Sequence, residues 1–88
     1  MVHAIHAVRE ETLEDLVREL DHAVMMNGLF RSAHEFLGVL DEEVWEVKQE
    51  IYKQRDKYNM SKMYEEAIQV AAVALRFADE IRSNLHHG

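Results

Sequence analysis

Carboxylates that interrupt an apolar helix face are the residues of this sequence with the clearest capacity for chemistry. Counting about 100° per residue from Phe36, Glu43 falls at roughly −20°, inside the apolar stripe, and Glu46 and Glu50 follow on the same flank. Carboxylates beside a buried surface are costly unless something neutralises them. Because several hard oxygen donors suit Mg²⁺ or Mn²⁺, the pattern predicts a divalent-cation site.

A second apolar stripe carries a carboxylate of its own. Counting from Met63, Glu66 lies at roughly −60°, on the face that also includes Val70. Two helices joined by a short connection pack antiparallel, so the two interrupted faces can meet. We therefore expect one metal-binding pocket formed by Glu43, Glu46 and Glu66, completed by Glu50 or Gln69.

An ordinary structural role stays open for each of these glutamates. A glutamate at the edge of a core can extend to water, or pair with a cation such as Lys53, Lys57 or Arg76. An ordinary helical bundle, however, places its charges on the face opposite the apolar stripe. The interruption of both stripes is what favours the metal site.

Apolar residues that recur every three or four positions predict three helices. The first runs from a cap at Thr12 to the Asn27-Gly28 pair, which favours a helix end. The second opens with a capping box of the form S-x-x-E, from Ser32 to Glu35. Both ends of the first connection are therefore marked in the sequence.

The C-terminal third of the chain forms the third predicted helix. The second helix ends between residues 52 and 58, and residues 59–61 offer a break and a new cap. Val70, Ala74 and Ile81 belong to the apolar face of the third helix. With no proline and three glycines, the chain lacks the turn residues of a β-rich domain. We expect an all-α fold, in which three helices form an antiparallel bundle.

Length and charge bound the class of protein. The 88 residues make a single domain, residues 1–88, with a thin core, because so short a chain buries only about 60% of its unfolded surface. The formal net charge of −7 repels a nucleic-acid backbone, so a phosphate ligand needs divalent cations as intermediaries. Cysteine is absent and no secretory or transmembrane segment is evident, so we expect a cytoplasmic protein without nucleic-acid or membrane partners.

Apolar residues outside the core stripes predict self-association. Residues 70–75 are apolar on every side of the third helix, and Leu37, Trp45 and Tyr52 lie outside the stripe of the second. A second layer must cover these residues, and two-fold symmetry is the commonest solution. We expect a homodimer or a dimer of dimers that completes the bundle. Trp45 can pack in this interface or stack on a nucleotide base, and packing is the favoured interpretation.

Three blocks of the chain together resemble a known family. They are residues 32–35, residues 39–47 and residues 65–77, and the resemblance extends over residues 32–79. Blocks of this kind resemble small bacterial and phage MazG-like proteins, which are all-α nucleoside triphosphate pyrophosphohydrolases. The resemblance implies Mg²⁺-dependent cleavage between the α and β phosphates, which releases a nucleoside monophosphate and pyrophosphate.

The resemblance also assigns roles to the glutamates. The family carries ExxE on one helix and ExxD on the next, and these residues hold Mg²⁺ at the phosphates of the nucleotide. Glu43 and Glu46 match the first motif, and Glu66 begins the second. Gln69 stands where the family has aspartate; its carbonyl oxygen can bind a cation but brings no charge. Glu50, one turn beyond Glu46, can supply the missing carboxylate.

Several side chains are candidates for contact with the substrate. Lys53 and Lys57 continue the flank of the second helix past the carboxylates, and Arg76 lies two turns beyond Gln69. His34 can line the pocket or contact the cap of the second helix. Each of these residues can equally be an ordinary solvated charge or a local contact.

Three functions are consistent with the sequence. The first is an active pyrophosphohydrolase with Glu43, Glu46 and Glu66 in the catalytic centre. The second is a catalytically impaired relative that binds nucleotide without turnover, because Gln69 replaces the acidic residue. The third is a helical protein-interaction module whose acidic residues keep it in solution.

Overall fold

Three helices make up the described part of the chain. The computed structural model describes residues 7–53 and 59–87, without the side chains of Asn27 and residues 85–87. The helices are α1 (Glu10–Asn27), α2 (Ala33–Ile51) and α3 (Met60–His87), and no strand occurs in these ranges. The all-α prediction is confirmed. No helix in the same ranges has both the length and the apolar character needed to cross a membrane.

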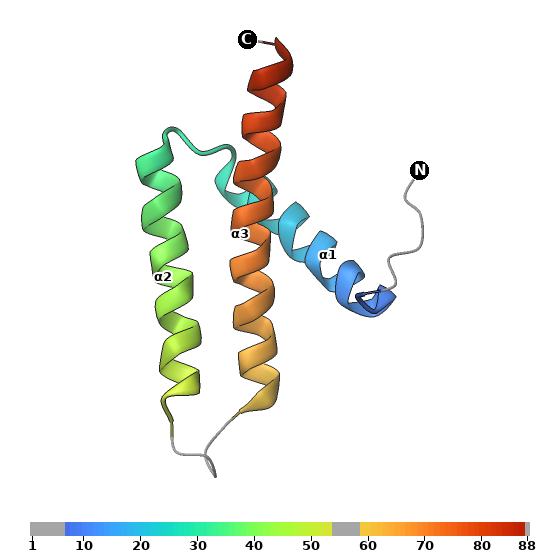
Figure 1. Cartoon of the computed structure of the whole chain (residues 1–88), viewed down its shortest axis with the longest axis vertical. Coiled ribbons are helices and arrows are strands. Elements are labelled where there is room, and N and C mark those ends of the chain that lie inside the picture. Colours follow the sequence, from blue (N-terminus) through green and yellow to red (C-terminus); the bar gives the residue numbers. More distant parts are fainter. Residues whose placement is uncertain (1–6, 54–58, 88) are drawn as a thin grey trace.

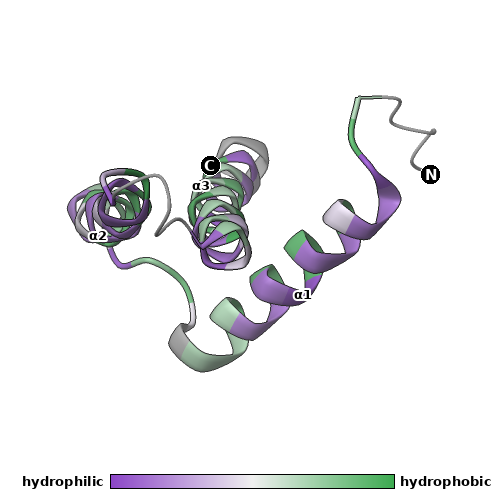
Figure 2. Cartoon of the chain, turned by 90° about the horizontal axis from the view of Figure 1, so that it is seen from below, coloured by the Kyte–Doolittle hydropathy of each residue, from purple (hydrophilic) through white to green (hydrophobic). Residues whose placement is uncertain are grey.

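The central helix is α3, and both other helices pack against it. α2 runs antiparallel beside α3, and α1 crosses α3 obliquely (Figure 1). Viewed along α2 and α3, α1 lies crosswise to both helices (Figure 2). Within the described ranges α1 and α2 do not pack against each other. The expected antiparallel pair is present, and the closed bundle stays a prediction for an assembly.

The start of α1 differs from the prediction. The helix begins at Glu10, two residues before the expected cap at Thr12, and its N-cap residue Arg9 makes no side-chain capping bond. Two acidic residues, Glu10 and Glu11, lie in the first turn, where a negative charge interacts favourably with the helix dipole. The start of α1 is therefore stabilised by negative charge in its first turn and not by the side-chain cap that the sequence predicts. The end of α1 is confirmed, since Gly28 follows it with a φ of 70° that suits glycine.

Side-chain caps begin the other two helices, as the sequence predicts. The Oγ atom of Ser32 accepts a hydrogen bond of 3.1 Å from the backbone N–H of Glu35. At α3, the Oδ1 atom of Asn59 accepts one of 3.0 Å from the N–H of Lys62. α2 ends at Ile51, one residue before the range 52–58 in which the sequence predicts its end.

The core is small and its centre is polar. In the described residues, the buried apolar side chains are Ala72 and Val73, both on α3. Glu50, Glu66 and Arg76 are equally well buried. Charged side chains therefore lie in the contacts that hold α3 to its neighbours.

The buried arc of α3 overlaps the predicted apolar stripe only in part. Ala74 is exposed and Ile81 is 41% exposed, whereas Glu66, Val73 and Arg76 are buried. Periodicity identifies where a helix is apolar, but the positions of α1 and α2 decide which arc of α3 is covered. The single chain therefore covers one edge of the apolar face, with Glu66, and leaves Ala74 and Ile81 at the surface.

Three aromatic rings fasten the connection between α1 and α2 to α3. Phe36 and Phe77 stack with ring centroids 3.9 Å apart, and Phe30 meets each of them edge to face at 5.6 and 6.1 Å. Phe36 lies near the start of α2, and Phe77 lies on α3. This aromatic cluster therefore holds the N-terminal end of α2 against α3.

Large apolar side chains remain on the surface of the single chain. Leu37 is 50% exposed, Trp45 is 58% exposed and Tyr52 is 73% exposed. The radius of gyration is 14.8 Å, whereas a compact domain of this length has about 12 Å. Both observations agree with the expectation of an assembly, which stays a prediction.

We expect the protein to sediment as a dimer or a dimer of dimers at micromolar concentration. Trp45→Glu should shift the distribution toward a single chain of 10.3 kDa, because it places a charge in the predicted interface. Ser83→Glu adds the same charge at an exposed position of α3, eight residues beyond the apolar segment 70–75, and should leave the assembly unchanged. A parent protein that sediments only at 10.3 kDa would contradict the prediction.

Candidate metal centre

Three glutamates converge where α2 packs against α3. Glu43 and Glu46 come from α2 and Glu66 from α3, and one carboxylate oxygen of each lies within 4.8 Å of the other two. Glu66 is buried, Glu43 is half-buried and Glu46 is exposed, so the cluster reaches from the helix interface to the solvent. The structure brings these side chains together as the sequence predicts, and cation binding stays a prediction.

A shared proton links Glu46 to Glu66. The hydrogen bond with Glu66, followed by desolvation and the charge of Glu43, raises the pKa of Glu46 to about 7. Burial raises the pKa of Glu66, but the hydrogen bond from Glu46 and the ion pair with Lys62 outweigh it, so this pKa is lowered. Lys62 Nζ lies 2.9 Å from Glu66 Oε1. At neutral pH the cluster therefore carries less negative charge than three free carboxylates.

Gln69 joins the two helices across the cluster. Both neighbours of its amide are carboxylates, so the NH₂ end faces them; it donates to Glu43 Oε2 at 2.8 Å and to Glu66 Oε2 at 3.2 Å. Desolvation, followed by the charge of Glu66, raises the pKa of Glu43. The amide lies where the sequence predicts a ligand, and in this state it acts as a donor to two anions.

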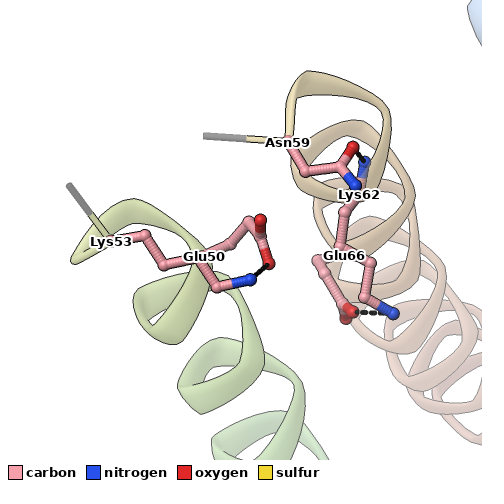
Figure 3. Close-up of polar contacts among 5 residues, drawn as sticks. All are labelled: Glu50, Lys53, Asn59, Lys62 and Glu66. Carbon is pink, nitrogen blue, oxygen red and sulfur yellow. Dashed lines mark hydrogen bonds and ion pairs between the residues drawn. The ribbon is translucent and has the colours of Figure 1, made fainter. Parts of the chain in front are cut away.

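Glu50 lies one turn beyond the cluster and is also turned toward α3. Its carboxylate lies between the two helices, and Lys53 Nζ contacts its Oε2 atom at 3.0 Å (Figure 3). Glu50 is 4% exposed, and its Oε1 atom has no hydrogen-bond partner in residues 7–53 and 59–87. Native proteins seldom leave a buried carboxylate oxygen unpaired. The Oε1 atom of Glu50 is therefore a buried acceptor without a donor among the described residues.

The other predicted site residues are not gathered at the cluster. Lys53 follows α2 and is paired with Glu50, and Lys57 lies outside the described residues. Arg76 is buried ten residues along α3 from Glu66, about 15 Å at 1.5 Å per residue. His34 is exposed in the first turn of α2, two turns and more before the glutamates.

A cleft between α1 and α3 adjoins the cluster through Gln69. Its volume is about 690 Å³, and the sequence analysis did not predict it, because no site residue was expected on the first helix. The lining residues are Asp15, Arg18, Glu19, His22, Ser61, Tyr64, Glu65, Ile68 and Gln69. The hydroxyl of Tyr64 donates to Asp15, and this hydrogen bond raises the pKa of Tyr64 and lowers that of Asp15.

Lys62 is the contact residue of the cluster that sequence reasoning missed. It precedes Glu66 by four residues, which places both side chains on one face of a helix. A lysine four residues before a glutamate predicts an ion pair, but the same spacing is typical of ion pairs on the solvated surface of a helix. Burial of Glu66, which the sequence does not reveal, gives the pair its importance.

Comparisons with protein-family models, with curated proteins and with solved structures find no significant match to this chain. The resemblance to MazG-like proteins therefore rests on the three sequence blocks, and the functional argument rests on the geometry of the cluster.

The raised pKa of Glu46 predicts a pH dependence of stability in metal-free solution. Between its ordinary value of 4.5 and about 7, the folded chain holds a proton on Glu46 that the unfolded chain has lost. Glu46 therefore stabilises the fold at low pH, and this contribution is lost as the pH rises through 7. We expect the free energy of unfolding of the parent, minus that of Glu46→Gln, to fall over this range.

Urea denaturation in EDTA between pH 4 and 8, followed by circular dichroism, measures this difference. Titrating groups outside the cluster occur in both proteins and cancel in the subtraction. If the free energies of unfolding of the parent and of Glu46→Gln change with pH in parallel, Glu46 does not share a proton with Glu66.

Proposed function

We propose that this protein is a Mg²⁺-dependent nucleotide pyrophosphohydrolase that acts as a homo-oligomer and cleaves a nucleoside triphosphate to a monophosphate and pyrophosphate. The observation that carries the proposal is the convergence of Glu43, Glu46 and Glu66 within 4.8 Å at the α2–α3 contact. These residues are the ones that the resemblance assigns to the metal.

The donor set fits a hard divalent cation. All three side chains offer oxygen, which suits Mg²⁺ and Mn²⁺ better than softer metals. The unpaired Oε1 atom of Glu50 supports the same conclusion, because a buried acceptor beside an acidic cluster attracts positive charge. Gln69 can turn its amide and present the carbonyl oxygen in place of the NH₂ group.

The residues of the cluster have two roles in this proposal: some would bind the cation, and one would accept a proton. A bound divalent cation supplies Lewis acidity and lowers the pKa of a water molecule. Glu43 and Glu66 would hold the cation, and Lys62 keeps Glu66 ionised. Glu46 reaches the solvent, and a bound cation would displace its proton, so its ionised carboxylate would be suited to accept a proton from the water that attacks the α phosphate.

The cleft between α1 and α3 is suited to the nucleoside. Its volume of about 690 Å³ lies within the usual range of about 300–1,000 Å³ for small-molecule sites. Tyr64 lines the cleft and is 41% exposed, so its ring is partly open to contact with a base. Gln69 belongs to both the cleft and the cluster, so a nucleotide in the cleft can direct its phosphates toward the glutamates.

One observation favours the impaired relative as the second candidate function. Gln69 donates to both Glu43 and Glu66, which relieves their repulsion without any cation. A cluster already stabilised by these hydrogen bonds has less need of a metal ion. Nucleotide binding in calorimetry without turnover would select this function. An absence of thermal stabilisation by Mg²⁺ with nucleotide would select the protein-interaction module instead.

We expect Mg²⁺-dependent release of pyrophosphate from a set of canonical and modified nucleoside triphosphates. Glu43→Gln should lower kcat/KM at least about 100-fold, because it removes a charge that would hold the cation. Asp41→Asn makes the same charge change at an exposed position of α2 and should retain activity. Turnover that persists in EDTA, or equal activity of the two variants, would refute the mechanism.

Glu43→Gln should also melt at a higher temperature than the parent in EDTA. Desolvation and the charge of Glu66 both disfavour the ionised carboxylate of Glu43, and the amide removes this cost. The carbonyl oxygen of the new side chain can still accept from Gln69. Thermal denaturation checks the prediction, and an unchanged or lower melting temperature would count against the crowding of charges.

A further inference from the structure

Arg76 is a buried charge that the proposed function does not use. It is 6% exposed, and its Nε atom has no hydrogen-bond partner in the described part of the chain. A guanidinium group carries five N–H donors and stays charged in proteins. Removing such a group from water is costly unless it is paired and hydrogen-bonded.

The neighbours of Arg76 compensate its charge only in part. Phe30 covers one face of the guanidinium group, with the ring centroid 3.7 Å from Cζ. Glu80 is the nearest carboxylate, with Oε2 at 3.7 Å from Nε, beyond hydrogen-bonding distance. Both oxygens of Glu80 already accept from the backbone N–H of Phe30, at 3.1 and 3.3 Å. The Nε–H group is therefore left without an oxygen acceptor among the described residues.

A hollow of about 360 Å³ lies beside this group, between the α1–α2 connection, the start of α2 and α3. Arg31 and Arg76 both line it, together with Phe30 and Glu35. The carboxylate of Glu35 is engaged at the start of α2, where Oε1 accepts from the N–H of Arg31 at 3.0 Å. The hollow therefore presents two cations, one carboxylate that is engaged with the backbone, and the positive end of a helix.

We propose that this hollow is an oxyanion site that binds a phosphate group, with Arg76 as its anchor and Arg31 as the second cation. Arginine donates two parallel hydrogen bonds to a phosphate or carboxylate group, and Arg76 lines the hollow. The cleft on the other side of Arg76 is lined by Asp21, Asp79 and Glu80, which repel an anion.

The oxyanion site is separate from the glutamate cluster. Arg76 follows Glu66 by ten residues of α3, so the two sites lie about 15 Å apart along the helix. The phosphate site needs no divalent cation and does not depend on the proposed hydrolysis.

Inorganic phosphate, titrated into the isotopically labelled full chain in EDTA at constant ionic strength, tests the proposal. We expect saturable changes in the ¹H–¹⁵N signals of the Phe30 amide and the Arg76 Nε–H group. Arg76→Met should weaken binding at least about tenfold, because charge-assisted hydrogen bonds are lost. Arg82→Met changes an exposed arginine of the same helix and should bind as the parent does.

A further variant guards against loss of binding through misfolding. Glu80→Gln removes the carboxylate that competes for Arg76 while keeping an acceptor for the Phe30 amide, so it should bind phosphate several-fold more tightly. A nucleoside monophosphate, titrated in parallel, distinguishes a site for free phosphate from one for a nucleotide phosphate. No saturable change at Phe30 and Arg76, equal binding by Arg76→Met, or weaker binding by Glu80→Gln would overturn the proposal.

Discussion

The crowding of carboxylates where α2 meets α3 is the constraint on which the rest of the structure depends. Three glutamate oxygens lie within 4.8 Å of one another, in a chain whose described part buries only two apolar side chains, Ala72 and Val73. So small a core offsets little electrostatic repulsion. A proton on Glu46, the ammonium group of Lys62 and the amide of Gln69 reduce the repulsion within the chain. A divalent cation would remove more of it, so metal binding and folding are expected to be coupled.

The helix α3 joins the fold to both proposed sites. It is the element that α1 and α2 both contact, and its buried arc carries Glu66 in one half and Arg76 in the other. Opposite charges at two levels of one helix create two chemically different environments, one suited to a cation and one to an oxyanion. Because α1 and α2 do not pack together within the described ranges, each leaves a cleft against α3 that a ligand can enter.

Sequence reasoning succeeded where a local pattern determines the outcome. The cap at Ser32 depends on residues three positions apart, and the meeting of Glu43 with Glu66 follows from two interrupted stripes and a short connection. Sequence reasoning failed where contacts between helices determine which side chains are buried. The burial of Arg76 depends on a loop residue 46 positions earlier, Phe30, whose ring covers the guanidinium group. Periodicity gives the direction of a side chain on its own helix, whereas burial depends on where the neighbouring helices lie.

Calorimetric titration with Mn²⁺ in buffers of different ionisation enthalpy tests the central claim most directly, because it detects cation binding and proton release together. The pKa of Glu46 is about 7, so a cation bound at pH 6 should displace its proton. The heat of binding should then depend on the buffer at pH 6 and much less at pH 8, and Glu66→Gln should abolish binding. An absence of Mn²⁺ binding, or binding that Glu66→Gln leaves unchanged, would contradict the assignment of the cluster as a metal centre.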